Sequence, residues 1–195
     1  MSYAFDSTLA STLWPVRSRS RLLRNAVLAV GGSLLLALSA KVQVPFYPVP
    51  MTLQTLAVLV LGAAFGARLA AATVALYLVE GLLGLPVFAG AVAGPAYMAG
   101  PTGGFLVGFL VAAAMIGWLA ERGWDRSWAT LLAAMALGHV IVFAFGFAWL
   151  AALIGPAKAF AAGVAPFALA TVVKTLLACA LIGAAWSAVA QLRDA

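Results

Sequence analysis

The sequence has few charged residues. Asp, Glu, Lys and Arg make up 8% of its 195 residues, against about 25% in a typical soluble domain. Hydrophobic residues make up 66%, against roughly 45–50% in such a domain. So few polar side chains cannot cover a surface that faces water, and so apolar a chain does not stay disordered. The composition therefore excludes a soluble domain and predicts a polytopic integral membrane protein.

Cysteine and histidine are nearly absent. The chain has one of each, Cys179 and His139, which excludes a disulfide framework and a zinc site built on thiolates. Nucleophilic catalysis needs a positioned base beside Ser or Cys, and no nucleotide-binding Walker motif is present. We therefore expect no enzyme, no metal and no cofactor. Both residues are interpreted as packing residues, although a ligand role for His139 stays open.

Apolar stretches long enough to cross a bilayer recur along the chain. A membrane helix needs about 20 mostly apolar residues, and turns such as Gly66-Ala67-Arg68 and Gly155-Pro156 separate the stretches. We expect an all-α integral membrane protein, a single domain over 1–195 with a cytoplasmic tail over about 1–21. The six predicted transmembrane helices cover about 22–44, 51–65, 68–84, 103–120, 129–154 and 165–190.

The basic residues predict the orientation, because they stay preferentially in the cytoplasm. With the N-terminus inside, every arginine falls on the cytoplasmic side, whereas Lys41, Lys158 and Lys174 fall toward the outer side. This explains the net charge of +6 without a nucleic-acid partner. We expect both termini in the cytoplasm and a multi-pass protein of the cytoplasmic (inner) membrane. The arginines are Arg17, Arg19, Arg21, Arg24, Arg68, Arg122, Arg126 and Arg193.

Two irregular segments, Gln43–Pro50 and Leu85–Thr102, fall on the outer side of this topology. Non-helical backbone at membrane depth is tolerated only where protein buries it or where it lines a cavity. Loops as long as the second segment are uncommon in compact proteins unless they have a function. We therefore expect structured outer loops that form a lid and a wall over a pocket between helices. The alternative is that both are ordinary connectors.

Lys174 is an ionisable residue inside the sixth predicted helix. Its own helix carries no acidic residue within one turn, and an intramembrane cation needs an anion from the protein or from a ligand. Glu80 is the nearest acidic candidate by depth. The alternative is that the lysine reaches the membrane interface by snorkelling.

Small residues on the first predicted helix form a stripe. Ala29, Ser33 and Ala37 are spaced by four and lie along one face, and such stripes let another helix approach closely. The partner helix belongs either to another subunit or to the same bundle.

Three motifs occur in order along the chain: Pro48-Val-Pro-Met-Thr-Leu-Gln-Thr55, Gly84-Leu-Pro-Val-Phe-Ala-Gly90 and Gly100-Pro-Thr-Gly-Gly104. With this spacing, residues 25–190 resemble the BioY family, the biotin-specific substrate-capture (S) components of energy-coupling-factor (ECF) transporters. The resemblance implies a six-helix bundle with an outward-facing biotin site, and high-affinity biotin binding and uptake. It also implies a transmembrane coupling subunit and ATPase subunits as partners, with the stripe of small residues at the coupling contact.

This chain departs from the family pattern at two places. Phe105 stands where the family usually has tyrosine, which removes a hydroxyl group. In the sixth helix Pro166-Phe167 and Lys174 match the pattern Pro-Phe-x-Pro-Gly-Asp-x-x-Lys, but residues 169–171 read Leu-Ala-Thr instead of Pro-Gly-Asp. The usual aspartate is thus replaced by Thr171.

Buried recognition of biotin needs apolar walls, a few hydrogen-bond partners and a cation. Alternatives are an S component for another small vitamin and a non-transporting structural subunit. A shared or dedicated ATPase module and a solitary homo-oligomer are equally compatible with the sequence. The expected site residues are Lys174 as the cation, Phe46, Phe88 and Tyr97 as walls, Gln54, Thr102 and Thr171 as polar contacts, and backbone groups of Gly90, Gly100 and Gly103.

Overall fold

The computed structural model describes residues 8–15 and 20–194, which are mostly helical. Arg17, Arg19 and the side chain of Arg193, expected on the cytoplasmic side, lie outside the described part. In chain order the elements are α1 (Leu9–Leu13), α2 (Arg21–Lys41), β1 (Gln43–Val44), β2 (Met51–Thr52), α3 (Gln54–Phe65), α4 (Ala67–Leu82), α5 (Pro95–Ala99), α6 (Gly103–Ala120), α7 (Trp128–Ile154), α8 (Pro156–Gly163), the 3₁₀ turn η2 (Ala165–Phe167) and α9 (Ala168–Asp194).

Four helical stretches of the described residues are long and apolar enough to cross a membrane. They are α2, α6, α7 and the stretch Pro156–Leu192, which joins α8, η2 and most of α9. Helix α3 is apolar but has only 12 residues, or about 18 Å of helix. Helix α4 carries Arg68 and Glu80. The structure therefore supports a multi-pass membrane protein, and the count of six spans stays a prediction.

The segment between α2 and α3 differs from the expected helix borders. Helix α2 ends at Lys41, and residues 51–52, expected in the second helix, form β2 instead. Strand β2 pairs antiparallel with β1, with Gln43 opposite Thr52 and Val44 opposite Met51. The prolines between the strands favour extended backbone and cannot continue a helix. Helix α3 therefore begins only at Gln54.

Three short helices lie where we expected none. Helix α1 lies in the predicted tail, α5 in the loop 85–102 and α8 in the connection after Gly155. Both α5 and α8 have proline in their first turn, where its fixed φ angle suits a helix and no hydrogen-bond donor is lost. Proline in these segments therefore starts a helix, whereas we expected it only to interrupt one.

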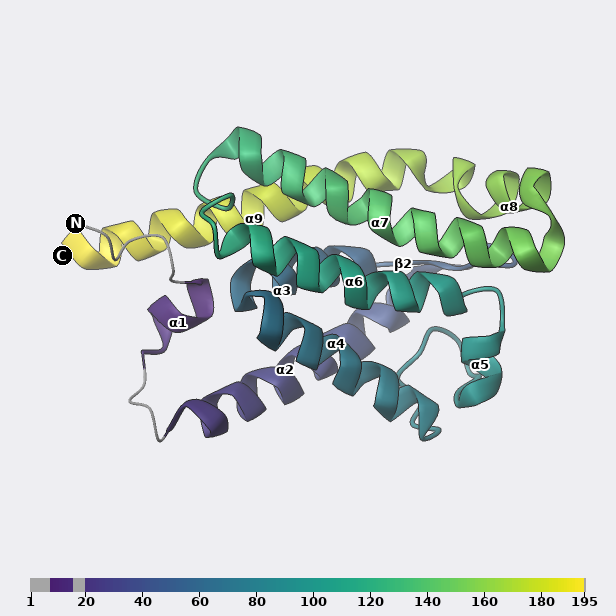
Figure 1. The fold of residues 1–195 in the computed structure, drawn as a ribbon, viewed down its shortest axis with the longest axis horizontal. Helices are drawn as coiled ribbons and strands as arrows, with labels where there is room; N and C mark the ends of the chain where they lie inside the picture. The colour runs from purple at the N-terminus through teal and green to yellow at the C-terminus, as the bar shows by residue number, and fades with distance from the viewer. Residues whose placement is uncertain (1–7, 16–19, 195) are drawn as a thin grey trace.

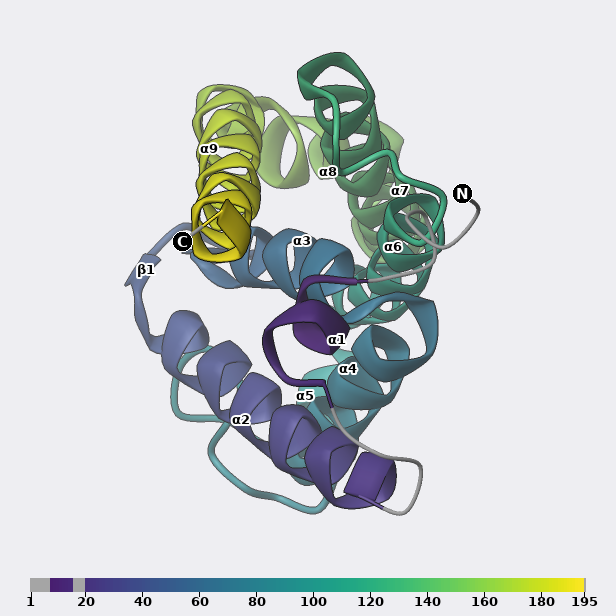
Figure 2. The ribbon, with the colours of Figure 1, turned by 90° about the vertical axis from the view of Figure 1, so that its left-hand side faces the viewer.

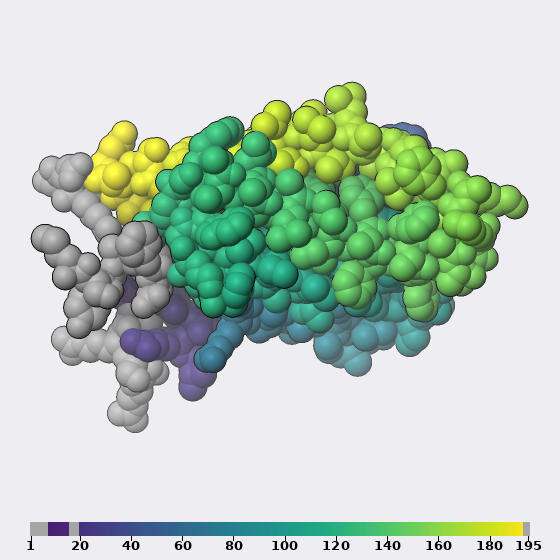
Figure 3. Space-filling view, turned by 45° about the horizontal axis from the view of Figure 1, so that its top comes forward, coloured from purple at the N-terminus to yellow at the C-terminus, as the bar shows by residue number. Residues whose placement is uncertain are grey.

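The long helices form three layers (Figures 1 and 2). Helices α7 and α9 form one outer layer, α2 and α4 form the other, and α3 and α6 lie between them. Helix α1, the beginning of α2 and the end of α9 lie at one end of the molecule, and α5 and α8 lie at the opposite end. In the space-filling view α7, α8 and α9 form a continuous face (Figure 3).

Glycines let the central helix α6 approach its neighbours closely. A Cβ atom on Gly104 or Gly108 would collide with backbone atoms of α7, and one on Gly117 would overlap the backbone of Gly66 and Ala67. Small residues at helix contacts are typical of membrane bundles, where packing replaces the hydrophobic driving force. These contacts place α6 against α4 and α7, and thereby define the space between the layers.

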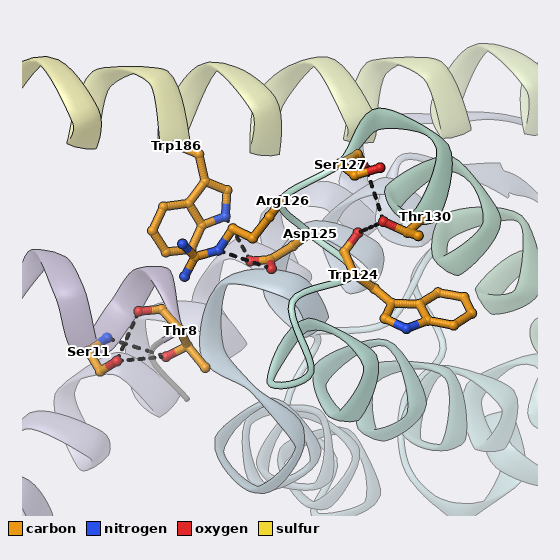
Figure 4. A network of polar contacts seen from close by, with 8 residues as sticks. All are labelled: Thr8, Ser11, Trp124, Asp125, Arg126, Ser127, Thr130 and Trp186. Atoms are coloured by element: carbon orange, nitrogen blue, oxygen red, sulfur yellow. Dashed lines mark hydrogen bonds and ion pairs between the residues drawn. The ribbon is translucent and has the colours of Figure 1, made fainter. Parts of the chain in front are cut away.

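A polar cluster joins the loop after α6 to α9 at the end that holds α1 (Figure 4). Asp125 is buried, and its Oδ2 accepts a hydrogen bond from Trp186 Nε1 at 2.7 Å. Arg126 forms an ion pair with Asp125 and lies over the Trp186 ring, 3.4 Å from its centroid. Burial raises the pKa of the Asp125 carboxyl, and the Trp186 hydrogen bond and the Arg126 charge oppose part of this rise. The cluster lies away from the loops at the other end.

Gly117→Ala should destabilise the protein, because the added methyl group meets backbone that cannot rotate away. Overpacking of this kind costs roughly 1–3 kcal/mol. Gly183→Ala on α9 is the matched control, since nothing lies within 4 Å of its added Cβ. Thermal unfolding in detergent should show a lower Tm for Gly117→Ala and an equal or higher Tm for Gly183→Ala. Equal Tm values for all three proteins would contradict the packing argument.

Candidate functional site

A pocket of about 560 Å³, its open mouth included, lies between α3, α6, α7 and α9. A second hollow of about 800 Å³ lies beside it, between residues 43–50 and 89–102. The two hollows share Pro50, Ala89, Tyr97 and Thr102, so the two irregular segments meet at the mouth of the pocket. The pocket is lined by Val49, Pro50, Thr52, Gln54, Thr55, Ala89, Tyr97, Thr102, Phe105, Leu106, Phe109, His139, Val142, Phe143, Phe167, Ala170, Thr171 and Lys174.

Lys174 lines this pocket and connects α9 to the beginning of α3. Its Nζ donates to the carbonyl oxygen of Thr52 at 2.6 Å and to Thr55 Oγ1 at 3.0 Å. The one ion pair in the described part of the chain joins Arg126 and Asp125, so neutral oxygens are the recorded partners of this ammonium group. Glu80, the acidic candidate by depth, accepts a hydrogen bond from Ser33 instead. The pocket thus contains a cation that forms no ion pair with any carboxylate of the described residues.

Gln54 belongs to a buried chain of hydrogen bonds behind the pocket. Thr52 Oγ1 donates to Gln54 Oε1 at 3.2 Å, and Gln54 Nε2 donates to Tyr77 Oη at 2.6 Å. Tyr77 in turn donates to the carbonyl oxygen of Val87 at 3.2 Å. The chain connects the turn before α3 through α4 to the loop 83–94. Gln54 lines the pocket, but both ends of its amide already form hydrogen bonds with Thr52 and Tyr77. Its main role is therefore to hold the wall of the pocket in place.

Aromatic rings form much of the wall. Tyr97 lines the pocket and stacks on Phe88, with 4.8 Å between ring centroids. Phe88 is buried behind it and makes an edge contact with Tyr77. Phe46 lines the outer hollow but not the pocket. Its ring centroid lies 6.2 Å from that of Phe167, which lines the pocket. Tyr97 therefore forms the wall directly, Phe88 supports it, and Phe46 lies at the entrance.

Residues 9–191 match the family model described as the BioY family. The chain belongs to the BioY family. Among its relatives, the probable biotin transporter BioY of Pyrococcus horikoshii is 36% identical over 144 residues, 74% of this chain and 85% of the relative. The biotin transporter BioY of Rhizobium etli is 39% identical over 159 residues, 77% of this chain and 84% of the relative.

The fold is also that of a solved structure. The crystal structure of the S-component for biotin from an ECF-type ABC transporter superposes with a TM-score of 0.68. The match covers 92% of this chain and 96% of that chain at 21% identity. At this identity the likeness concerns the fold alone.

Of the three glycines expected at the site, two line the outer hollow and one lies at a helix contact. Gly90 and Gly100 line the outer hollow, and their carbonyl oxygens accept hydrogen bonds from Lys41 Nζ at 3.3 Å and Trp149 Nε1 at 2.9 Å. Gly103 lies on neither surface, and a Cβ there would overlap the carbonyl oxygen of Met98. Gly103 therefore allows α5 and α6 to meet closely, whereas the other two lie at the entrance.

Thr102 and Tyr97 lie together at the mouth of the pocket. Burial raises the pKa of the Tyr97 phenol, and hydrogen bonding with Thr102 and with the backbone of Ala89 opposes part of this rise. The phenol therefore stays protonated at neutral pH and can donate a hydrogen bond. Thr171 also lines the pocket, from α9, where the family pattern places an aspartate.

Several lining residues were not predicted. Thr52 and Thr55 belong to the first family motif, and their positions on either side of Gln54 were a usable signal. The rings of Phe109 and Phe143 lie inside long apolar helices, where nothing in the sequence distinguishes a wall from ordinary packing. His139 also lines the pocket, and the sequence left its ligand role open.

The stripe of small residues on α2 faces the bundle. Ser33 is 1% exposed and donates a hydrogen bond to Glu80 of α4. Ala37 packs against the hydrophobic core, and Ala29 is half-buried. Ser33 and Ala37 therefore pack against the bundle of this chain, and a contact of the stripe with another subunit stays a prediction. The outward face of α2 is apolar and exposed at Val30, Leu34 and Leu38, among others.

Tyr77→Phe should destabilise the protein, because Gln54 Nε2 loses its acceptor while it stays buried. An unsatisfied buried donor costs about 1–3 kcal/mol. Tyr47→Phe is the control, since Tyr47 is 94% exposed. Thermal unfolding in detergent should give a lower Tm for Tyr77→Phe only. A Tm equal to that of the control would mean that the hydrogen-bond chain does not hold the wall.

Proposed function

We propose that this chain binds biotin and acts as the substrate-specific component of an ECF transporter for biotin uptake. Three findings support this: the family match over 9–191, relatives named as biotin transporters, and the fold of a biotin S-component. The observation that carries the proposal is the cation of Lys174, which lines the pocket and bonds only to neutral oxygens among the described residues.

The pocket suits the chemistry of biotin. Biotin has an apolar thiophane ring and aliphatic chain, a ureido group and one carboxylate. Lys174 lacks a carboxylate partner in the described protein, so an anionic ligand group gains more from it than a neutral one does. We therefore assign the carboxylate of biotin to Lys174. Tyr97, Thr102, Thr171 and Gln54 complete the proposed contacts inside the pocket, and Phe46, Phe88, Gly90, Gly100 and Gly103 form or support its wall and entrance.

The proposed topology has six spans, both termini in the cytoplasm and the loops outside. In its favour, Arg21, Arg68 and Arg122 lie at helix borders of one end of the bundle, which also holds α1 and the end of α9. Cytoplasmic loops carry an excess of basic residues. The pocket mouth then opens on the outer side of the cytoplasmic membrane, as capture of an external vitamin requires.

The proposed partners are the transmembrane coupling subunit and the ATPase subunits of an ECF transporter. No nucleotide-binding motif occurs in this chain, so ATP hydrolysis has to come from other subunits. Helix α2 is a suitable contact because its outward face is apolar and only partly covered by the bundle. Ala29, at the edge of the stripe, borders this face.

The direct test is equilibrium binding of labelled biotin to the purified chain without partners. Saturable binding that other vitamins do not displace would support the proposal. Displacement of biotin by another small vitamin at lower concentration would favour an S component for that vitamin. Absence of saturable binding would refute the substrate assignment and favour a structural subunit.

Lys174→Met should weaken biotin binding by about ten- to a hundredfold. A hydrogen bond to a charged group contributes about 1.5–3 kcal/mol, and methionine keeps the length and the apolar stem of the lysine. Lys158→Met is the matched control, because Lys158 is an exposed lysine on α8, outside the pocket lining. Isothermal titration of both variants measures the difference, and a Tm measurement verifies that they are folded.

The amide of biotin identifies the ligand group at Lys174. If the lysine binds the carboxylate, wild-type protein should bind the amide nearly as weakly as Lys174→Met binds biotin. If the wild-type protein binds the amide as tightly as biotin, the lysine instead binds the ureido group. Wild-type affinity of Lys174→Met for biotin would mean that the lysine serves only to connect α9 to α3.

Ala29→Leu should leave biotin binding intact and lower uptake in cells, because a larger side chain separates α2 from the coupling subunit. Ala37→Leu is the comparison, since Ala37 packs against the core and overpacking there should lower the Tm as well. Unchanged uptake by Ala29→Leu, with the partner complex still assembled, would exclude this face as the coupling contact.

A further inference from the structure

His139 has a buried nitrogen without a hydrogen-bond partner. The residue lies on α7, is 3% exposed and lines the pocket. Its Nδ1 lies 3.0 Å from Thr175 Oγ1, whereas Nε2 has no recorded partner in the described part of the chain. Among the described residues, Thr12 Oγ1 and Asp125 Oδ1 are also buried without a hydrogen bond, but Asp125 Oδ1 forms the ion pair with Arg126, and neither residue lines the pocket. Since buried polar groups are nearly always paired, the exception needs an explanation.

His139 borders two hollows, and a ligand in the pocket can supply a partner for its Nε2. On its other side His139 borders an apolar groove of α7, α8 and α9, whose lining includes Phe143, Phe147 and Leu176. In a membrane this groove faces acyl chains, which offer no hydrogen bond. A polar group of a ligand in the pocket is then the available partner for this nitrogen.

His139 marks the end of the pocket that lies away from the loops. Trp149 donates to the carbonyl oxygen of Gly100 beside the entrance, and His139 precedes Trp149 by ten residues of the same helix, or roughly 15 Å. Lys174 extends from α9 to Thr52 of strand β2, and His139 contacts Thr175, the next residue of α9. Apolar lining residues of the pocket include Phe109 and Val142.

We propose that His139 is a specificity-determining residue whose Nε2 forms a hydrogen bond with the ureido group of biotin at the inner end of the pocket. This rests on the proposed function and on the assignment of the carboxylate to Lys174. The ureido group carries both N–H donors and a carbonyl acceptor, so it matches Nε2 in either tautomer of the imidazole. A site built to pair such a group rejects ligands that lack it.

The test compares two substitutions that each keep one half of the imidazole. Glutamine places its amide near the position of Nε2, whereas asparagine reaches only the position of Nδ1. His139→Asn should therefore weaken biotin binding by roughly tenfold, and His139→Gln should retain affinity within a few-fold of wild type. Thr175→Val removes the Thr175–His139 hydrogen bond but leaves Nε2 in place, and should weaken binding less than His139→Asn.

Biotin amide shows which end of the ligand the histidine contacts. His139→Asn should weaken biotin and its amide by the same factor, because both carry the ureido group. A loss confined to biotin would overturn the ureido assignment. Equal losses for His139→Asn, His139→Gln and Thr175→Val would show a structural role and overturn the proposal. Saturable biotin binding by wild-type protein keeps these failures distinct from failure of the proposed function, and Tm values verify that each variant is folded.

Discussion

Every polar group inside a membrane protein needs a partner within the protein or its ligand, because lipid offers none. This constraint organises the described structure. The carboxylate of Glu80 bonds to Ser33, the amide of Gln54 to Tyr77, and the phenol of Tyr77 to the carbonyl oxygen of Val87. These bonds hold α2, α3, α4 and the outer loop together around the pocket. Against this background the ammonium group of Lys174 and the Nε2 of His139 are two groups at the pocket without a charged partner or a hydrogen-bond partner, respectively, among the described residues.

The same constraint divides the expected site residues into two groups. Lys174, Tyr97, Thr102 and Thr171 line the pocket itself, so they can touch a ligand. Gln54 also lines it, but its hydrogen bonds are directed to the protein. The remaining residues of the family motifs act through packing. Phe88 supports Tyr97, and Gly103 allows α5 to meet α6. Motif residues are thus required for the shape of the site as much as for contact with the ligand.

Sequence reasoning identified the class of the protein and most of its helical regions, because long apolar runs and Gly-Pro interruptions are strong signals. It placed the border of α3 three residues too early, since it did not see that residues 51–52 pair with 43–44. It missed α5 and α8 because proline reads as a break, although it is also a helix start. Ser33 turns toward the bundle, where it donates a hydrogen bond to Glu80, 47 residues away. No local sequence pattern predicts this contact.

Threonine at residue 171, where the family pattern has aspartate, changes the surroundings of Lys174. Residues three apart on a helix lie on the same face, so an aspartate at 171 would place a carboxylate beside the ammonium group. Thr171 supplies a hydroxyl group instead, and Lys174 bonds to two neutral oxygens of Thr52 and Thr55. These two hydrogen bonds hold the ammonium group in place, but neutral oxygens do not neutralise its positive charge. Under the function proposed above, the carboxylate of biotin supplies the anion that residue 171 of this chain does not provide.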